Sequence, residues 1–210
     1  MDELLRFAEK YYETITEELG FRRFEFWTWD KKCKIHLYSS LEEYQEAANQ
    51  PRWSGAAAYP KERLIITFLG KPDFFETILP HEMAHLIFRE FVGYKTDLPL
   101  WLDEGIACLQ EKSNRELYLR IAKILVKTSV FIPLEKLTEI RREGLVMQDV
   151  FYAESASVVQ FLLKEYGNEK FVDYCRKLRD NRNWKVSLIE VYGFKNLSEM
   201  NEKWIDFLLR

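Results

Sequence analysis

Two histidines and a glutamate lie within one five-residue segment, His81-Glu82-Met83-Ala84-His85. In a helix, residues four apart lie on the same face, one turn apart. Both imidazoles can therefore reach one metal ion at about 2.0–2.1 Å from each nitrogen. Glu82, between them, would project toward the open side of that ion and take a proton from a water molecule there. The pattern predicts a zinc site with a hydrolytic function.

Glu104 is the residue that we expect to complete this site. It follows His85 after eighteen intervening residues, enough for a helix end, a loop and the start of a second helix. Two histidines and one glutamate leave a fourth position open for water, whereas four protein ligands usually close a structural zinc site. Gly105 and Ala107 are small, and we expect them to let the second helix approach the first. The prediction is one Zn²⁺ per chain, bound by His81, His85 and Glu104.

The order H-E-x-x-H, eighteen residues, then W-L-x-E-G-x-A resembles the motif of the gluzincin metallopeptidases, as in the aminopeptidase N family. The chain is also similar to compact peptidase MA-like domains over about residues 30–208. Residues 152–167, a Tyr-led helix that ends in Tyr-Gly, and the closing helix after Tyr192-Gly193 carry that similarity. The resemblance implies an α+β fold of the zincin, thermolysin-like type, with a small mixed sheet on a mostly helical body. It also implies a peptidase that acts on peptide or protein substrates, with Glu82 as general base.

Three further residues have roles that the resemblance suggests. In larger gluzincins a tyrosine on a following helix hydrogen-bonds the oxyanion, and Tyr152 is similar in placement; packing is the alternative, because the chain holds 11 tyrosines. Glu111 lies two turns after Glu104 and would support a metal ligand from behind, or would face solvent. Asp103 has the same two interpretations, as a supporting residue or as an acid near a helix start.

The segment Gly55-Ala56-Ala57-Ala58 precedes the metal helices much as the Gly-Ala-Met-Glu-Asn strand does in aminopeptidases. Such an edge strand binds extended peptide through main-chain hydrogen bonds; a core strand of small residues is the alternative. Ala58 stands where aminopeptidases place the glutamate that grips a free amino group. This departure favours internal cleavage of peptides over removal of N-terminal residues.

Two other functions stay open at this point. One is a zinc-binding peptide-recognition or regulatory module on the same fold without proteolytic activity, because fold alone does not fix function. The other is hydrolysis of a non-peptide substrate. Glu82 favours an enzyme, since a structural metal would not need it. The sequence leaves open the oligomeric state and whether residues 128–150 cover the site.

Composition excludes several classes of function. The 210 residues fit a single domain, and the net charge of −3 gives no basic field that would recruit nucleic acid. No apolar run approaches a membrane span, and the N-terminus lacks signal-peptide features, so we expect a cytoplasmic protein.

Cys33, Cys108 and Cys175 form no C-x-x-C pair and indicate free thiols. His36 lies on a predicted strand, and we expect it to be a surface or partly buried residue.

Periodicity predicts strands early in the chain and helices late. We expect a strand-rich part at about residues 22–70, metal helices at about 74–112 and a helical part at about 113–210. The sheet should hold three to five strands, at about 24–27, 34–38, 54–59 and 63–68. Helices are expected at about 3–19, 40–48, 74–91, 99–112, 114–128, 134–142, 149–166, 168–179, 184–192 and 198–209.

Overall fold

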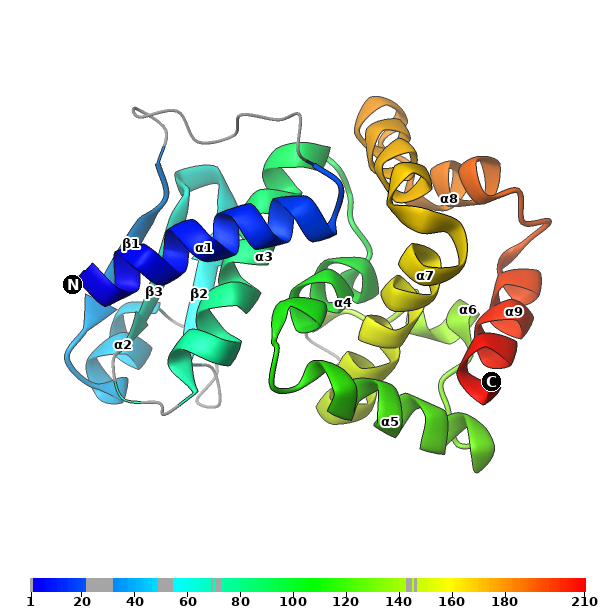
Figure 1. The fold of residues 1–210 in the computed structure, drawn as a ribbon, viewed down its shortest axis with the longest axis horizontal. Helices are drawn as coiled ribbons and strands as arrows, with labels where there is room; N and C mark the ends of the chain where they lie inside the picture. Colours follow the sequence, from blue (N-terminus) through cyan, green and yellow to red (C-terminus); the bar gives the residue numbers. More distant parts are fainter. Residues whose placement is uncertain are drawn as a thin grey trace.

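The computed structural model describes residues 2–21, 32–48, 55–68, 70, 73–142, 145 and 147–210. The N-terminal part holds a small sheet with helices α1 and α2, and the rest of the described chain is helical (Figure 1). This confirms the expected α+β class. The elements are α1 (Asp2–Glu18), β1 (Lys34–Tyr38), α2 (Leu41–Ala48), β2 (Ala56–Tyr59), η2 (Pro60–Glu62), β3 (Leu64–Phe68), η3 (Phe74–Ile78), α3 (Leu79–Val92), α4 (Leu100–Gln110), α5 (Arg115–Lys127), α6 (Leu134–Leu137), α7 (Gln148–Asn181), α8 (Trp184–Tyr192) and α9 (Leu197–Leu209).

The sheet is mixed, as predicted, with strand order β1-β3-β2 in the described residues. β1 runs parallel to β3, and β2 runs antiparallel to β3, which places β2 at one edge. The 3₁₀ turn η2 connects β2 to β3, and Arg63 follows it with a φ of 50°. Alternate residues of β3 face opposite sides: Ile65 joins the core with α1 and α3, while Ile66 packs with Tyr44 of α2.

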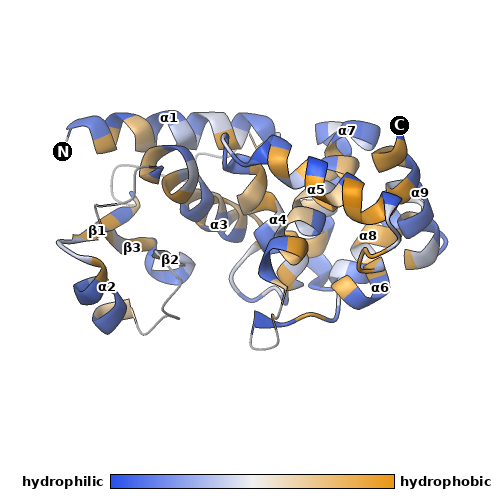
Figure 2. Ribbon diagram, turned by 90° about the horizontal axis from the view of Figure 1, so that it is seen from below, coloured by the Kyte–Doolittle hydropathy of each residue, from blue (hydrophilic) through white to orange (hydrophobic). Residues whose placement is uncertain are grey.

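Helix α3 is covered by α1 on one side and faces α4 on another. The ring of Phe21, which follows α1, stacks on the ring of Phe91 on α3, with the ring centroids 3.9 Å apart. In Figure 2, α1 is largely hydrophilic with a few hydrophobic residues, as expected for a helix with one buried stripe. Helix α4 differs, because every residue from Trp101 to Gln110 is buried. A helix that is enclosed all round forms the centre of the molecule, and its position is set by packing on several neighbours.

Gly105 makes a close contact with a different helix from the one that the sequence predicted. We expected it to let α4 approach α3. Instead, a Cβ added at Gly105 would lie 2.4 Å from the Ser155 carbonyl oxygen and 2.9 Å from Cγ2 of Val159, both on α7. Gly105 therefore lets α4 pack directly on the backbone of α7, on the side of α4 where no side chain fits.

The helices expected at 149–166 and 168–179 both form, and they share the label α7 because they meet at Gly167, whose backbone is non-helical (φ 82°, ψ 162°) and kinks the chain. The helix expected at 134–142 is wrong beyond Leu137, because α6 is a single turn. The apolar spacing continues to Ile140, but the Arg141 guanidinium donates to the carbonyls of Thr138 and Ile140. A helix that reached residue 142 would use the Thr138 carbonyl internally.

Other predictions of local structure have mixed outcomes. The three cysteines are free, with Cys108 and Cys175 buried and Cys33 partly buried, as expected. The strand expected at about 24–27 lies outside the described residues. Among the helices that the structure describes, none combines the length and apolar character needed to cross a bilayer.

Candidate metal centre

The two histidines of the motif share one face of α3, as the four-residue spacing predicted. Nε2 of His81 and Nε2 of His85 lie 3.2 Å apart, and the two rings meet edge to face at 76°. Each ring is mostly buried, with 18% of the His81 side chain and 10% of the His85 side chain exposed. Helix α3 therefore presents two imidazole nitrogens at nearly one point.

Helix α4 brings Glu104 to the same point. Its Oε2 lies 3.5 Å from Nε2 of His81 and 3.8 Å from Nε2 of His85. Ligand atoms at about 2.0–2.1 Å from a tetrahedral zinc ion lie about 3.3–3.4 Å from one another. The three observed separations, 3.2, 3.5 and 3.8 Å, are close to that value. The donor set and its spacing thus fit a zinc ion with little adjustment of the side chains.

Each of the two histidines uses its other nitrogen to contact an acidic residue. Nδ1 of His81 lies 2.7 Å from Oε1 of Glu111, which is the residue just after α4. Nδ1 of His85 lies 3.1 Å from Oδ1 of Asp103. Asp103 in turn accepts two hydrogen bonds on Oδ2 from Arg89, at 3.1 and 2.8 Å. A carboxylate behind each Nδ1 fixes the ring so that Nε2 points to the common centre.

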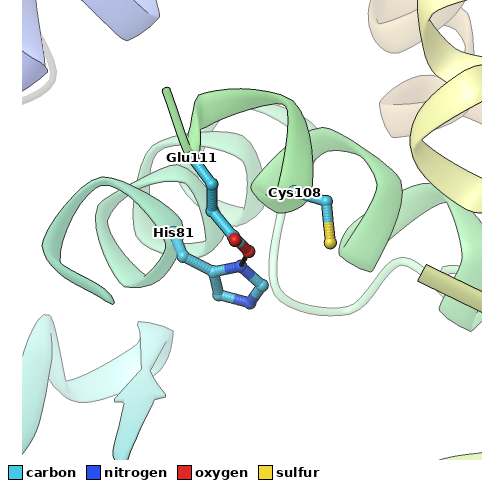
Figure 3. Close-up of side chains that lie close together, drawn as sticks. All are labelled: His81, Cys108 and Glu111. Atoms are coloured by element: carbon cyan, nitrogen blue, oxygen red, sulfur yellow. Dashed lines mark hydrogen bonds and ion pairs between the residues drawn. The ribbon is translucent and has the colours of Figure 1, made fainter. Parts of the chain in front are cut away.

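Cys108 lies beside this arrangement, whereas its place in the sequence predicts only a free thiol. Figure 3 shows Cys108 on α4 near His81 and Glu111, with the hydrogen bond between the last two dashed. Ligand atoms of these three residues lie within 4.8 Å of one another. The 2.7 Å separation of His81 and Glu111 is shorter than two ligands of one zinc ion allow. His81, His85 and Glu104 are therefore the better-shaped metal group of the two. The sequence could have indicated this neighbourhood, because residues 104, 108 and 111 are spaced by four and then three positions and so share one helix face.

Arg142 is the site residue that sequence reasoning missed. It follows α6, and its Nη2 forms an ion pair with Oε1 of Glu104. Nothing in the local sequence marks it, because the contact joins residues 38 positions apart. Each candidate ligand therefore has one charged outer partner: Glu111 for His81, Asp103 for His85 and Arg142 for Glu104.

Burial and charge act in opposite directions on the ionisable groups of the site. Burial alone would raise the pKa of Glu104, but the hydrogen bond to His81 and the charges of the histidines and Arg142 lower it to about 2. Burial opposes protonation of His81, yet its hydrogen bonds to Cys108, Glu104 and Glu111 raise its pKa well above the usual value. The carboxylates are ionised at neutral pH, and an arriving metal ion must displace protons from the imidazoles.

The candidate ligands line a cavity of about 610 Å³. Residues 55–59, which include all of β2, line the same cavity, as do Glu82, Arg142 and Tyr152. Glu82 is half-buried. Burial and the neighbouring Glu104 raise the pKa of Tyr152, so its hydroxyl stays protonated. His36 lies elsewhere, exposed on β1 and stacked on Tyr38 at 4.7 Å.

Comparison with known proteins identifies the family of the chain. No curated protein matches the sequence. The family profile described as peptidase MA superfamily matches residues 28–210, which is nearly the whole chain. The match includes the small sheet, both helices of the candidate metal centre and the helical C-terminal part. The chain therefore belongs to the peptidase MA superfamily and has a metallopeptidase-like domain.

Proposed function

We propose that this protein is a zinc-dependent peptidase of the gluzincin type, with His81, His85 and Glu104 as the metal ligands. The observation that supports this most directly is the convergence of three ligand atoms at zinc-compatible separations, on residues that line a cavity. A site closed by a fourth protein ligand would serve structure, whereas three ligands leave a position for water. A bound zinc ion supplies a Lewis acid that acidifies water and polarises a carbonyl group.

Glu82 and Tyr152 supply the proton transfer and the hydrogen bond that peptide hydrolysis needs. Glu82 follows His81 on α3 and lines the cavity. Its carboxylate accepts a proton from the attacking water and passes it to the departing amine nitrogen. The Tyr152 hydroxyl, kept protonated by burial, donates to the carbonyl oxygen as that oxygen gains negative charge.

The edge strand β2 gives the substrate a place to bind. Gly55, Ala56, Ala57 and Ala58 line the cavity, and β2 pairs with β3 along its other side. An extended peptide can add to such an edge by main-chain hydrogen bonds, with little obstruction from alanine side chains. Ala58 carries no carboxylate for a free amino group, so the proposal does not include aminopeptidase activity.

The test is cleavage of a diverse peptide pool by the zinc-loaded protein, followed by mass spectrometry. Glu82→Gln should bind one zinc ion per chain and lose at least about 100-fold in cleavage rate, because general base catalysis contributes about 10²–10⁴-fold. Equal cleavage by the two proteins would overturn the role of Glu82. No cleavage by a protein shown to hold one zinc ion would contradict the peptidase and favour a peptide-recognition module.

A further inference from the structure

The guanidinium of Arg142 has hydrogen-bonding capacity that the described residues do not use. An arginine side chain carries five N–H donors. Among the described residues, Arg142 donates only to Glu104, through Nη2. Half of its side chain (51%) is exposed, whereas the Glu104 side chain is 3% exposed. Since Arg142 lines the cavity, its remaining donors are available to a molecule bound there.

The other basic residues that line the cavity differ from Arg142. Arg89 is engaged on all three nitrogens, with Nε and Nη2 bonded to Asp103 and Nη1 bonded to the Thr96 carbonyl. Lys61 lies on η2, the turn that follows the edge strand β2, and not on the helices that carry the candidate ligands. In the described part of the chain, Arg142 is thus the cationic side chain beside the candidate ligands that still has N–H donors without a partner.

The position of Arg142 limits which part of a substrate it can reach. Its guanidinium and the two imidazoles contact the two oxygens of the same carboxylate, with Oε1 toward Arg142 and Oε2 toward His81 and His85. The guanidinium is therefore one carboxylate group away from the candidate ligand atoms. Successive residues of an extended peptide advance by about 3.3–3.6 Å. A substrate group on Arg142 thus lies within one or two residues of the scissile bond.

We propose that Arg142 determines specificity by binding a carboxylate of the substrate, one or two residues from the bond that is cleaved. The inference rests on the proposed peptidase function and names its substrate class. Arginine and a carboxylate match in geometry and form strong paired hydrogen bonds, and Arg142 already holds one carboxylate, that of Glu104. The substrate carboxylate is either the C-terminus of the peptide or an acidic side chain.

Binding, measured apart from catalysis, tests this proposal. Zinc-loaded Glu82→Gln protein is titrated calorimetrically with acetylated peptides that differ only in a C-terminal acid or amide. A second pair of amidated peptides has glutamate or glutamine next to the last residue. Either the acid or the glutamate peptide should bind at least about 10-fold more tightly than its neutral partner, as expected for a charge-assisted hydrogen bond. The pair that shows the difference identifies the source of the carboxylate.

Variants of Arg142 and of the adjacent Arg141 test whether Arg142 causes the preference for a carboxylate. Adding Arg142→Ala or Arg142→Gln should abolish the preference, and Arg142→Lys should retain part of it. Arg141→Ala is the matched control, because it removes the same charge from an exposed neighbour whose hydrogen bonds, among the described residues, go to nearby carbonyls; the preference should remain in this variant. Direct binding of the carboxylate to zinc would give a preference that survives in Arg142→Ala, and that result would overturn the proposal. Equal binding of acid and neutral peptides would also overturn it, whether or not the wild-type protein cleaves peptides.

Discussion

Replacing Gly105 with alanine should destabilise the protein and weaken zinc binding, although alanine is the better helix former. Gly105 lies inside α4, next to Glu104. On helix propensity alone, alanine would stabilise the fold by about 1 kcal/mol. The new Cβ, however, would lie 2.4 Å from the Ser155 oxygen and 2.7 Å from its carbonyl carbon. Packing and propensity therefore predict opposite signs.

The contact distances set the size of the effect. Ordinary van der Waals contact begins at 3.4 Å, so α4 and α7 must separate by about 1 Å at this point. The neighbour is main chain, which cannot rotate away as a side chain can. Overpacking a core costs about 1–3 kcal/mol, occasionally more. Subtracting the gain of about 1 kcal/mol in propensity leaves a net loss of up to about 2 kcal/mol in the free energy of unfolding, and the main-chain contact favours the upper end of that range.

The same shift would move Glu104 relative to the histidines. Oε2 of Glu104 lies 3.5 and 3.8 Å from the two Nε2 atoms, so a displacement of α4 by about 1 Å would disturb the ligand spacing. Urea unfolding of the chelator-treated protein measures stability, and competition with a chromophoric chelator measures zinc affinity. Adding Val159→Ala to Gly105→Ala relieves only the 2.9 Å side-chain contact and should not restore either property. A Gly105→Ala protein as stable as wild type, with unchanged zinc affinity, would refute the reasoning.

Three further predictions concern the metal and pH. Zinc at 100 times its Kd should stabilise the wild-type protein by about 2.7 kcal/mol and should not stabilise His85→Ala; equal melting-temperature shifts would exclude His85 as a ligand. Glu111→Gln should weaken zinc binding by about 10–100-fold, because it removes the charge behind His81 Nδ1; an unchanged affinity in the chelator competition would contradict that support. Burial of Glu154 outweighs its hydrogen bond from the Ile132 N–H and raises its pKa to about 8. The native state therefore holds this proton to higher pH than the unfolded chain, and the free energy of unfolding should fall by a few kcal/mol as pH rises from about 4.5 to 8. Glu154→Gln should flatten that dependence in urea unfolding at several pH values, and an identical pH profile would show that Glu154 is not the cause.

The motif on α3 and its partner on α4 could be placed from the sequence because helix geometry fixes local spacing. Residues four apart must share a face, so His81 and His85 were certain to be neighbours if the segment was helical. The distance of Glu104 along the chain allowed one helix end and one loop, which the structure contains. Asp103 and Glu111 contact the histidines, which agrees with the interpretation that they support the candidate ligands from behind. Their part in metal binding stays a prediction.

Contacts between elements distant in sequence could not be placed in this way. Gly105 was correctly identified as a site of close approach, but its size does not reveal which helix approaches, and α7 rather than α3 contacts it. Arg142 lies at the end of the helix predicted at 134–142, but the observed helix α6 ends five residues before it, at Leu137. Only the path of the chain after α6 brings its guanidinium to Glu104. In both cases the missing information was tertiary, since periodicity describes one element at a time.

The two sides of α4 link the metal centre to the helical body. One side carries the charged Glu104 toward α3, and the neighbouring Gly105 places the other side on the backbone of α7. Because α4 is buried from Trp101 to Gln110, it cannot shift without disturbing both contacts. Tyr152 and Arg142 enter the cavity from the same helical body, on α7 and just after α6. The packing of α4 on α7 therefore sets the distance between the candidate ligands and the residues that we propose to act on the substrate. A ligand at the metal centre should stabilise that packing, and a loosened α4–α7 contact should reduce both metal affinity and turnover.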